Sequence, residues 1–166
     1  MGTNSLTEPV LFALTTCLKP RGYVKSGSTF RLRSPEIVSI VSMQSSTSST
    51  SALAKVTINL GIHVLALQDP QRPEKNPSTS SAHWHQRIGQ LMPEKNDVWW
   101  SIHTIDEAGS VAAEVVRRVE QFGLPALAQV STVPALQQLW VSGHSPGITD
   151  GQRVRYLQQL AEAVAS

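Results

Sequence analysis

Side chains that can bind ligands are concentrated in two short stretches of the sequence. One stretch contains His83, His85 and Arg87, and the other contains Asn59 and His63. An arginine offers a planar fork to a carboxylate or phosphate, a histidine titrates near neutral pH, and an asparagine both donates and accepts hydrogen bonds. If the two stretches are neighbouring strands, these groups share one face of a sheet and form a polar pocket.

An acidic residue after Arg87 gives this pocket two interpretations. Asp97 follows a predicted turn, so its carboxylate can pair with Arg87 across that turn. In the first interpretation the pair forms a ligand pocket with His83 and Asn59. In the second interpretation the same groups are a structural polar network, and the sequence leaves both open.

Zinc binding is a second kind of chemistry that the histidines could support. His83 and His85 are two positions apart, so on a strand both imidazoles point to the same side, and His63 could complete a three-histidine set. Such a site would activate a water molecule. No carboxylate lies nearby in the sequence to orient the rings. We therefore expect no metal and no other cofactor, with the three-histidine site as the alternative.

Three tryptophans accompany these polar residues. Trp99 and Trp100 are adjacent, so on a strand they point to opposite faces, and one of them is expected in the core. The other, together with Trp84, is expected on the outer face or rim of the sheet. An exposed aromatic ring among polar groups can anchor another protein. Burial of the rings under helices or loops is the competing interpretation.

The sequence contains no recognisable catalytic pattern. Cys17 lies in an apolar helical stripe, and the chain has no Gly-x-Ser-x-Gly elbow, phosphate-binding glycine loop or Cys-x-x-Cys pair. This favours a non-enzymatic module that binds another protein, such as an immunity-like or adaptor protein. The alternative is a small-ligand-binding protein or an enzyme that uses the pocket around His83 and Arg87.

The placement of all these residues depends on one long predicted strand. From Ala54 to Val64 apolar residues occupy every second position and polar residues or glycine lie between them. Successive side chains of a strand point to opposite faces, so the pattern predicts one apolar and one polar face. Such a pattern is typical of an antiparallel sheet covered on one side. We expect the helices on the face of the even-numbered residues.

Shorter patterns predict the other elements. Further strands are expected at 30–33, 37–43, 82–91 and 98–102, and helices at 7–18, 106–122, 124–130, 132–140 and 150–164. Asp106 is the expected N-cap of the second helix and Gly123 its end. The segments 44–52 and 68–81 are expected to be flexible loops. This order predicts one α+β domain over residues 1–166, with an antiparallel meander of four to five strands, an N-terminal helix and three to four C-terminal helices packed on one face.

Four stretches in the strand region also carry a resemblance to a known family. They are LKPRGYVKSGSTF (18–30), VTINLGIH (56–63), HWHQRIGQLMP (83–93) and DVWW (97–100). Together they resemble domain of unknown function 4304, a set of small, mostly bacterial proteins. The resemblance implies a sheet with helices and implies no reaction. It covers Gly22, Gly27, Phe30, Asn59, Leu60, Gly61, His83, Arg87, Ile88, Gly89, Asp97, Trp99 and Trp100, whereas Ala82 and His85 depart from the family's pattern.

Composition and charge limit the classes of partner. The net charge is +2 and the basic residues are scattered, so no nucleic-acid surface is expected. No apolar run reaches the ~20 residues that cross a bilayer, and the N-terminus lacks a signal-peptide pattern. The single cysteine fits a reducing compartment. We expect a soluble cytoplasmic protein whose partner is another protein.

Overall fold

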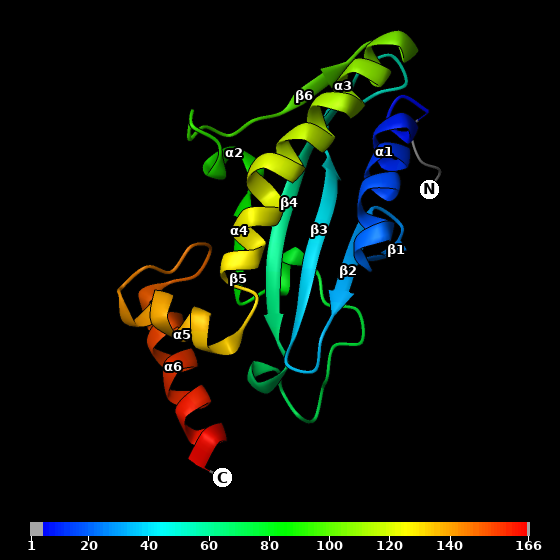
Figure 1. The fold of residues 1–166 in the computed structure, drawn as a ribbon. Helices are drawn as coiled ribbons and strands as arrows, with labels where there is room; N and C mark the ends of the chain where they lie inside the picture. Colours follow the sequence, from blue (N-terminus) through cyan, green and yellow to red (C-terminus); the bar gives the residue numbers. More distant parts are fainter. Residues whose placement is uncertain (1–4, 166) are drawn as a thin grey trace.

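The structure, a computed structural model, describes residues 5–165 as one antiparallel sheet with helices (Figure 1). The strands are β1 (Val24–Ser26), β2 (Thr29–Arg33), β3 (Ile37–Ser45), β4 (Ala54–Val64), β5 (Trp84–Arg87) and β6 (Trp100–Ile102). The helices are α1 (Glu8–Leu18), α2 (Ile88–Leu91), α3 (Ile105–Arg118), α4 (Leu124–Gln129), α5 (Val133–Val141) and α6 (Asp150–Ala165). Short 3-10 turns η1 (Lys19–Arg21), η2 (Leu65–Leu67) and η3 (Thr79–Ser81) and a π turn η4 (Val119–Gly123) complete the described elements. The predicted α+β class is confirmed.

The strands form a meander in the order β1-β2-β3-β4-β5, and all neighbours are antiparallel. β3 pairs along one edge of β4. β5 pairs with residues 59–62 of the other edge and β6 with residues 54–56. β5 and β6 therefore lie along the same edge of β4, like one strand that is interrupted by residues 88–99. The sequence missed β1 and predicted one strand over 82–91, whereas the structure ends β5 at Arg87 and continues as α2.

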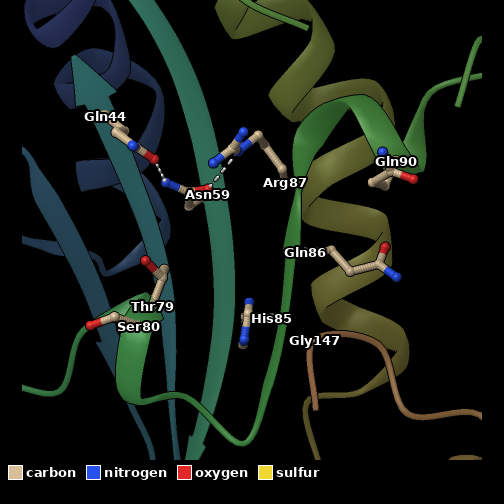
Figure 2. Close-up of a pocket in the computed structure, with 9 residues that line it drawn as sticks. All are labelled: Gln44, Asn59, Thr79, Ser80, His85, Gln86, Arg87, Gln90 and Gly147. Carbon is tan, nitrogen blue, oxygen red and sulfur yellow. Dashed lines mark hydrogen bonds between the residues drawn. The ribbon is translucent and has the colours of Figure 1, made fainter. Parts of the chain in front are cut away.

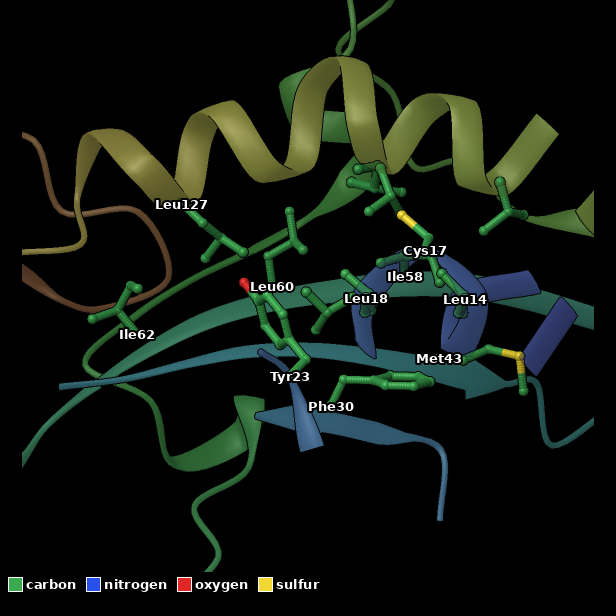
Figure 3. Close-up of a cluster of buried hydrophobic side chains, with 14 of the residues drawn as sticks. Leu14, Cys17, Leu18, Tyr23, Phe30, Met43, Ile58, Leu60, Ile62 and Leu127 are labelled. Atoms are coloured by element: carbon green, nitrogen blue, oxygen red, sulfur yellow. The ribbon is translucent and has the colours of Figure 1, made fainter. Parts of the chain in front are cut away.

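The core lies between the even-numbered face of β4 and the helices, as the alternation predicts. Every even-numbered residue from Ala54 to Val64 is buried. Helices α1 and α3 pack against each other above the sheet. Figure 3 shows Leu14 and Leu18 of α1 and Leu127 of α4 directed at strand residues that include Ile58 and Leu60. Burial of this apolar surface is the main stabilising contribution to the fold.

Helix α3 does not end at Gly123, which corrects the expectation from the sequence. The chain continues through the π turn η4 directly into α4. Gly123 instead permits close packing, because a Cβ there would lie 3.2 Å from Ile88 Cδ1 and 3.4 Å from Leu60 Cδ1. The N-cap of α3 is Thr104 rather than Asp106, since Thr104 Oγ1 accepts a hydrogen bond from the Glu107 N–H at 3.1 Å.

Helices α5 and α6 lie beside the β5 edge of the sheet, below α4 in Figure 1. Trp140 of α5 is buried, and its ring lies 5.7 Å from the Tyr156 ring of α6. The Tyr156 ring in turn meets His83, just before β5, edge to face at 5.0 Å. This aromatic chain anchors the last two helices to the sheet. Among residues 5–165, no helix is both long and apolar enough to cross a membrane.

Candidate functional site

The polar face of the sheet consists of two parts with different surroundings. We call Val38, Ile40, Gly61 and His63 the covered half, because all four are buried. We call Ser42, Gln44, Asn59 and Arg87 the open half, because all four are exposed or half-buried. The strand register places both sets on one face, since Ile40 is opposite Gly61 and Ser42 is opposite Asn59, which is itself opposite Arg87.

The segment from η2 to η3 folds back across the covered half. Arg31 Nε donates to the Pro77 carbonyl at 2.8 Å, and Arg33 Nη2 donates to the Lys75 carbonyl at 2.6 Å. Gly61 permits the approach, because a Cβ there would lie 2.9 Å from Ala82 Cβ. The region expected as a loop at 68–81 is therefore bound to the sheet, and it covers half of the face that the sequence predicts to be solvated.

His63 and His83 lie in the covered half or at its edge, and both are buried. His83 Nδ1 accepts a hydrogen bond from the Val64 N–H at 2.9 Å, so the ring extends the pairing of β4. Burial lowers the pKa of His83 to about 4, with a further contribution from nearby His63. His83 is therefore neutral at physiological pH and has a structural contact, which does not fit the expectation of a solvent-facing binding residue.

The three-histidine arrangement is not formed. The ring centres of His63 and His83 lie 4.9 Å apart with the planes tilted by 35°, and His63 Nε2 is 3.2 Å from Gln68 Oε1. His85 lies apart from both, in the groove described below. Among residues 5–165 no group of three histidine, cysteine, aspartate or glutamate side chains is arranged to hold a metal ion. Metal binding through His83 Nδ1 would also break its bond to β4.

Arg87 is the centre of a polar network in the open half. Its Nη1 donates to Asp97 Oδ2 at 2.7 Å, and its Nε donates to Asn59 Oδ1 at 3.4 Å. Trp99 Nε1 donates to the same Asp97 oxygen at 3.0 Å, and the guanidinium carbon lies 5.2 Å from the centre of the Trp99 ring. The hydrogen bond from Arg87 is the main cause that lowers the pKa of Asp97. The predicted Arg87–Asp97 pair is confirmed.

The same network connects the end of β5 with the segment that leads into β6, because Arg87 binds Asp97. Residues 88–99 leave the sheet after Arg87 and return at β6. Gly89 allows the two ends to touch, since a Cβ there would overlap the Asn96 carbonyl oxygen and lie 2.8 Å from Val98 N. Thr57 Oγ1 of β4 donates to the Val98 carbonyl at 2.6 Å. The Arg87 network thus has a structural role and also borders the open half.

A groove of about 560 Å³ lies at the open half and extends to β5 (Figure 2). Asn59 and Arg87 were expected in a pocket from the sequence, and His85 was expected on the same face of the sheet. The residues that sequence reasoning missed are Gln44, Thr79, Ser80, Gln86, Gln90 and Gly147. Figure 2 shows Gln86 and Gln90 on the opposite side of β5 from Asn59. Only the strand register and the fold-back of η3 bring these residues together, so no local pattern could have identified them.

Of the two adjacent tryptophans, one packs on the core as expected, whereas Trp84 does not lie where it was expected. Trp84 is opposite Ile62 on the apolar face and is 4% exposed, so its expected position on the outer face or rim is wrong. The reason is that the preceding residue, His83, already bonds the Ile62 carbonyl, which turns Trp84 inward. Trp100 packs on the apolar face opposite Val56. Trp99 is half-buried in the Arg87 network.

Comparison with known proteins supports the resemblance found in the strand region. No curated protein and no solved structure matches the chain. A family match covers residues 14–129, from within α1 to the end of α4. That range contains all of the groove residues except Gly147. The chain therefore belongs to the family described as domain of unknown function DUF4304.

Proposed function

We propose that this protein is a non-enzymatic binding module that recognises another protein through the groove in the open half. The conformation of Arg87 is the observation that carries this proposal. Asn59 and Asp97 hold two nitrogens of its guanidinium group, and Trp99 lies against it. Its third nitrogen, Nη2, has no acceptor among residues 5–165 and remains available to a ligand. A side chain fixed in this way loses little conformational entropy on binding.

The composition of the groove supports the same proposal. Its lining combines amide, hydroxyl and imidazole side chains around one arginine. Protein interfaces favour arginine and aromatic residues at the points of strongest contact, and they use surrounding polar groups for hydrogen bonds. Trp99, beside Arg87, supplies the aromatic ring. The groove is open to solvent, as contact with the surface of a partner requires.

The test is affinity capture from source-cell lysate, with matched variants. We expect the wild type to retain a partner in stoichiometric amount and Arg87→Gln to lose it. Arg33→Gln is the control, because Arg33 lies on the same face but its guanidinium binds Lys75 in the covered half. Recovery of no stoichiometric partner, or equal retention by Arg87→Gln, would contradict the proposal. Circular dichroism of each variant separates lost binding from lost folding.

A small-ligand-binding or enzymatic role is the second candidate, and the size of the groove favours it. A volume of about 560 Å³ lies within the range of roughly 300–1,000 Å³ typical of small-molecule sites. Melting curves recorded with pooled metabolites distinguish the two candidates. A ligand that raises the melting temperature of the wild type but not of Arg87→Gln would favour this second role.

The proposal includes the cytoplasm of a bacterium as the setting. The buried, unpaired thiol of Cys17 supports it, because free cysteines are typical of reducing compartments. The small net charge of +2 supports a partner other than nucleic acid or a membrane surface. Fractionation of the source cells tests the location directly.

A further inference from the structure

We propose that the groove recognises an uncharged, carbonyl-rich segment, whose carbonyl oxygens accept hydrogen bonds from Gln44 Nε2 and Arg87 Nη2 on the two sides of Asn59. The carbonyl would come from an extended main chain or from an asparagine or glutamine side chain of the partner. This inference rests on the proposed function and adds the chemical class of the ligand. Its basis is the direction of the hydrogen bonds that connect three side chains in the open half.

The direction of these bonds begins at Arg87. A guanidinium group has donors and no acceptor, so Arg87 Nε fixes the oxygen of Asn59 toward itself at 3.4 Å. The Asn59 nitrogen, Nδ2, must then point away, and it donates to Gln44 Oε1 at 2.7 Å. The order arginine, asparagine, glutamine therefore sets which end of each amide faces the groove (Figure 2).

One end of the groove consequently presents donors. Gln44 Oε1 is occupied by Asn59, so Gln44 Nε2 remains, and neither this nitrogen nor Arg87 Nη2 has an acceptor among residues 5–165. Gln44 is exposed and Arg87 is half-buried, so water satisfies these two donors in the free protein, and a ligand that covers them must supply an acceptor oxygen instead. A buried donor left without a partner lowers affinity, so a ligand that lacks this oxygen is discriminated against.

The local charge favours a carbonyl oxygen over a carboxylate. Asp97 lies 2.7 Å from Arg87, and as an aspartate whose pKa this contact lowers further it is ionised at neutral pH. The charge of Arg87 is therefore already balanced, so a second carboxylate would gain little attraction and would be repelled by Asp97. The remaining lining residues include Thr79, Ser80, Gln86 and Gln90. Such hydroxyl and amide groups both donate and accept, which matches alternating main-chain N–H and C=O groups.

The experiment is an NMR titration of the full-length, ¹⁵N-labelled chain with two blocked tripeptides. One probe is N-acetyl-Gly-Asn-Gly-amide, and the other is the same peptide with Asp in place of Asn. We expect the neutral peptide to shift the side-chain NH₂ signals of Gln44 and the Nε–H signal of Arg87 in a saturable way. We also expect the same apparent Kd at low and high salt, because no net charge is neutralised on binding.

Three variants of equal charge change sharpen this test. Gln44→Glu keeps an oxygen for Asn59 but replaces the free donor by an acceptor, so we expect affinity for the neutral peptide to fall about tenfold. Gln158→Glu introduces the same charge at an exposed position of helix α6 that does not line the groove, and we expect a change of less than about threefold. Asn59→Asp removes the donor to Gln44, so the Gln44 NH₂ signals should move even before any peptide is added.

Two results of the titration would overturn the inference. If the acidic peptide binds more tightly than the neutral one, and salt weakens its binding, the recognised group is a carboxylate rather than a carbonyl. The proposed binding function would still hold in that case. Absence of shifts at Gln44 and Arg87 with both peptides would reject recognition at this end of the groove. The lysate capture tests the binding function itself separately. That function is contradicted if the Arg87→Gln variant retains the partner.

Discussion

The covered and open halves of the polar face share strands β3 and β4, with Arg87 of β5 added in the open half, and they differ in what lies above them. In the covered half, the segment from η2 to η3 binds Arg31 and Arg33 and buries Val38 and Ile40. In the open half, the return of the chain at Val98 reaches Thr57 and leaves Asn59 beside a groove. One half thus contributes to stability, and the other is available for binding.

Side-chain size explains why the covering segment stops where it does. Gly61 lets Ala82 and Thr79 approach the sheet, whereas Asn59, two residues earlier, carries a side chain held by Gln44 and Arg87. An alternating pattern therefore shows which residues share a face, but not whether that face meets water. The predictions below test this division, beginning with the largest expected effect.

The largest loss of stability is expected from Gly89→Ala, at the border of the open half. The new methyl group would overlap the Asn96 carbonyl oxygen, and backbone atoms on both sides prevent relief. We expect the free energy of unfolding to fall by about 3 kcal/mol or more. The control is Gly109→Ala in helix α3, because a Cβ at Gly109 would meet no atom within 4 Å. Urea denaturation measures both, and a loss below about 1 kcal/mol for Gly89→Ala would contradict the close contact.

Truncation of Ile40 tests the covered half. Ile40 is fully buried on the polar face, so Ile40→Ala is expected to cost about 3 kcal/mol. Ser42→Ala, two residues along the same strand in the open half, is expected to change stability by less than about 0.5 kcal/mol. Equal effects in urea denaturation would show that the two halves do not differ in coverage.

Acid should destabilise the protein through His83. Its pKa is lowered from 6.5 to about 4 in the folded state, so stability is complete above pH 6.5. Between pH 6.5 and pH 4 the unfolded chain binds a proton that the folded chain does not, and roughly 3 kcal/mol is lost. His83→Gln should flatten this part of the stability–pH curve, whereas His85→Gln should leave the loss in place. A wild-type curve without this decline would argue against a buried, neutral His83.

The smallest effect on stability is expected from Asp97→Asn. The Arg87–Asp97 pair is partly exposed to solvent, with 33% and 50% of the two side chains accessible, so water screens it. We expect a loss of less than about 1 kcal/mol, reduced further at high salt. Thermal unfolding at two salt concentrations measures it, with Glu120→Gln, which affects the exposed ion pair with Arg21, as the matched control. A loss of several kcal/mol would contradict this screening and would mean that the pair contributes mainly to the stability of the fold.

Much of the fold follows from local patterns in the sequence. The alternation from Ala54 to Val64 identifies β4 with its observed bounds, and the helical stripe identifies α1 within one residue of its start. The short strands and turns predicted a meander but left the strand order undetermined, and the structure supplies that order. The interruption between β5 and β6 could not be predicted, because it depends on contact between Gly89 and Asn96 within the folded excursion.

The candidate site is predictable only in part. Asn59, Arg87 and Asp97 were identified from their chemistry and do meet in the structure. His63, His83 and Trp84 were also proposed, but all three are buried, the two histidines in or beside the covered half and Trp84 on the apolar face. Gln44 and the η3 residues carry no local signal. Their contribution depends on strand register and on long-range folding, which a single sequence does not encode in any short pattern.

The most direct test of the two halves is thiol labelling at matched positions of β3. Val38→Cys and Gln44→Cys, each in a Cys17→Ala background, place a thiol on the same face in the covered and open half. We predict that position 44 reacts at the rate of an unfolded chain. Position 38, which is 1% exposed, should react at least about a hundredfold more slowly, since its labelling requires a local opening of about 3 kcal/mol. Similar rates at the two positions would contradict the division of the polar face on which the proposed binding groove depends.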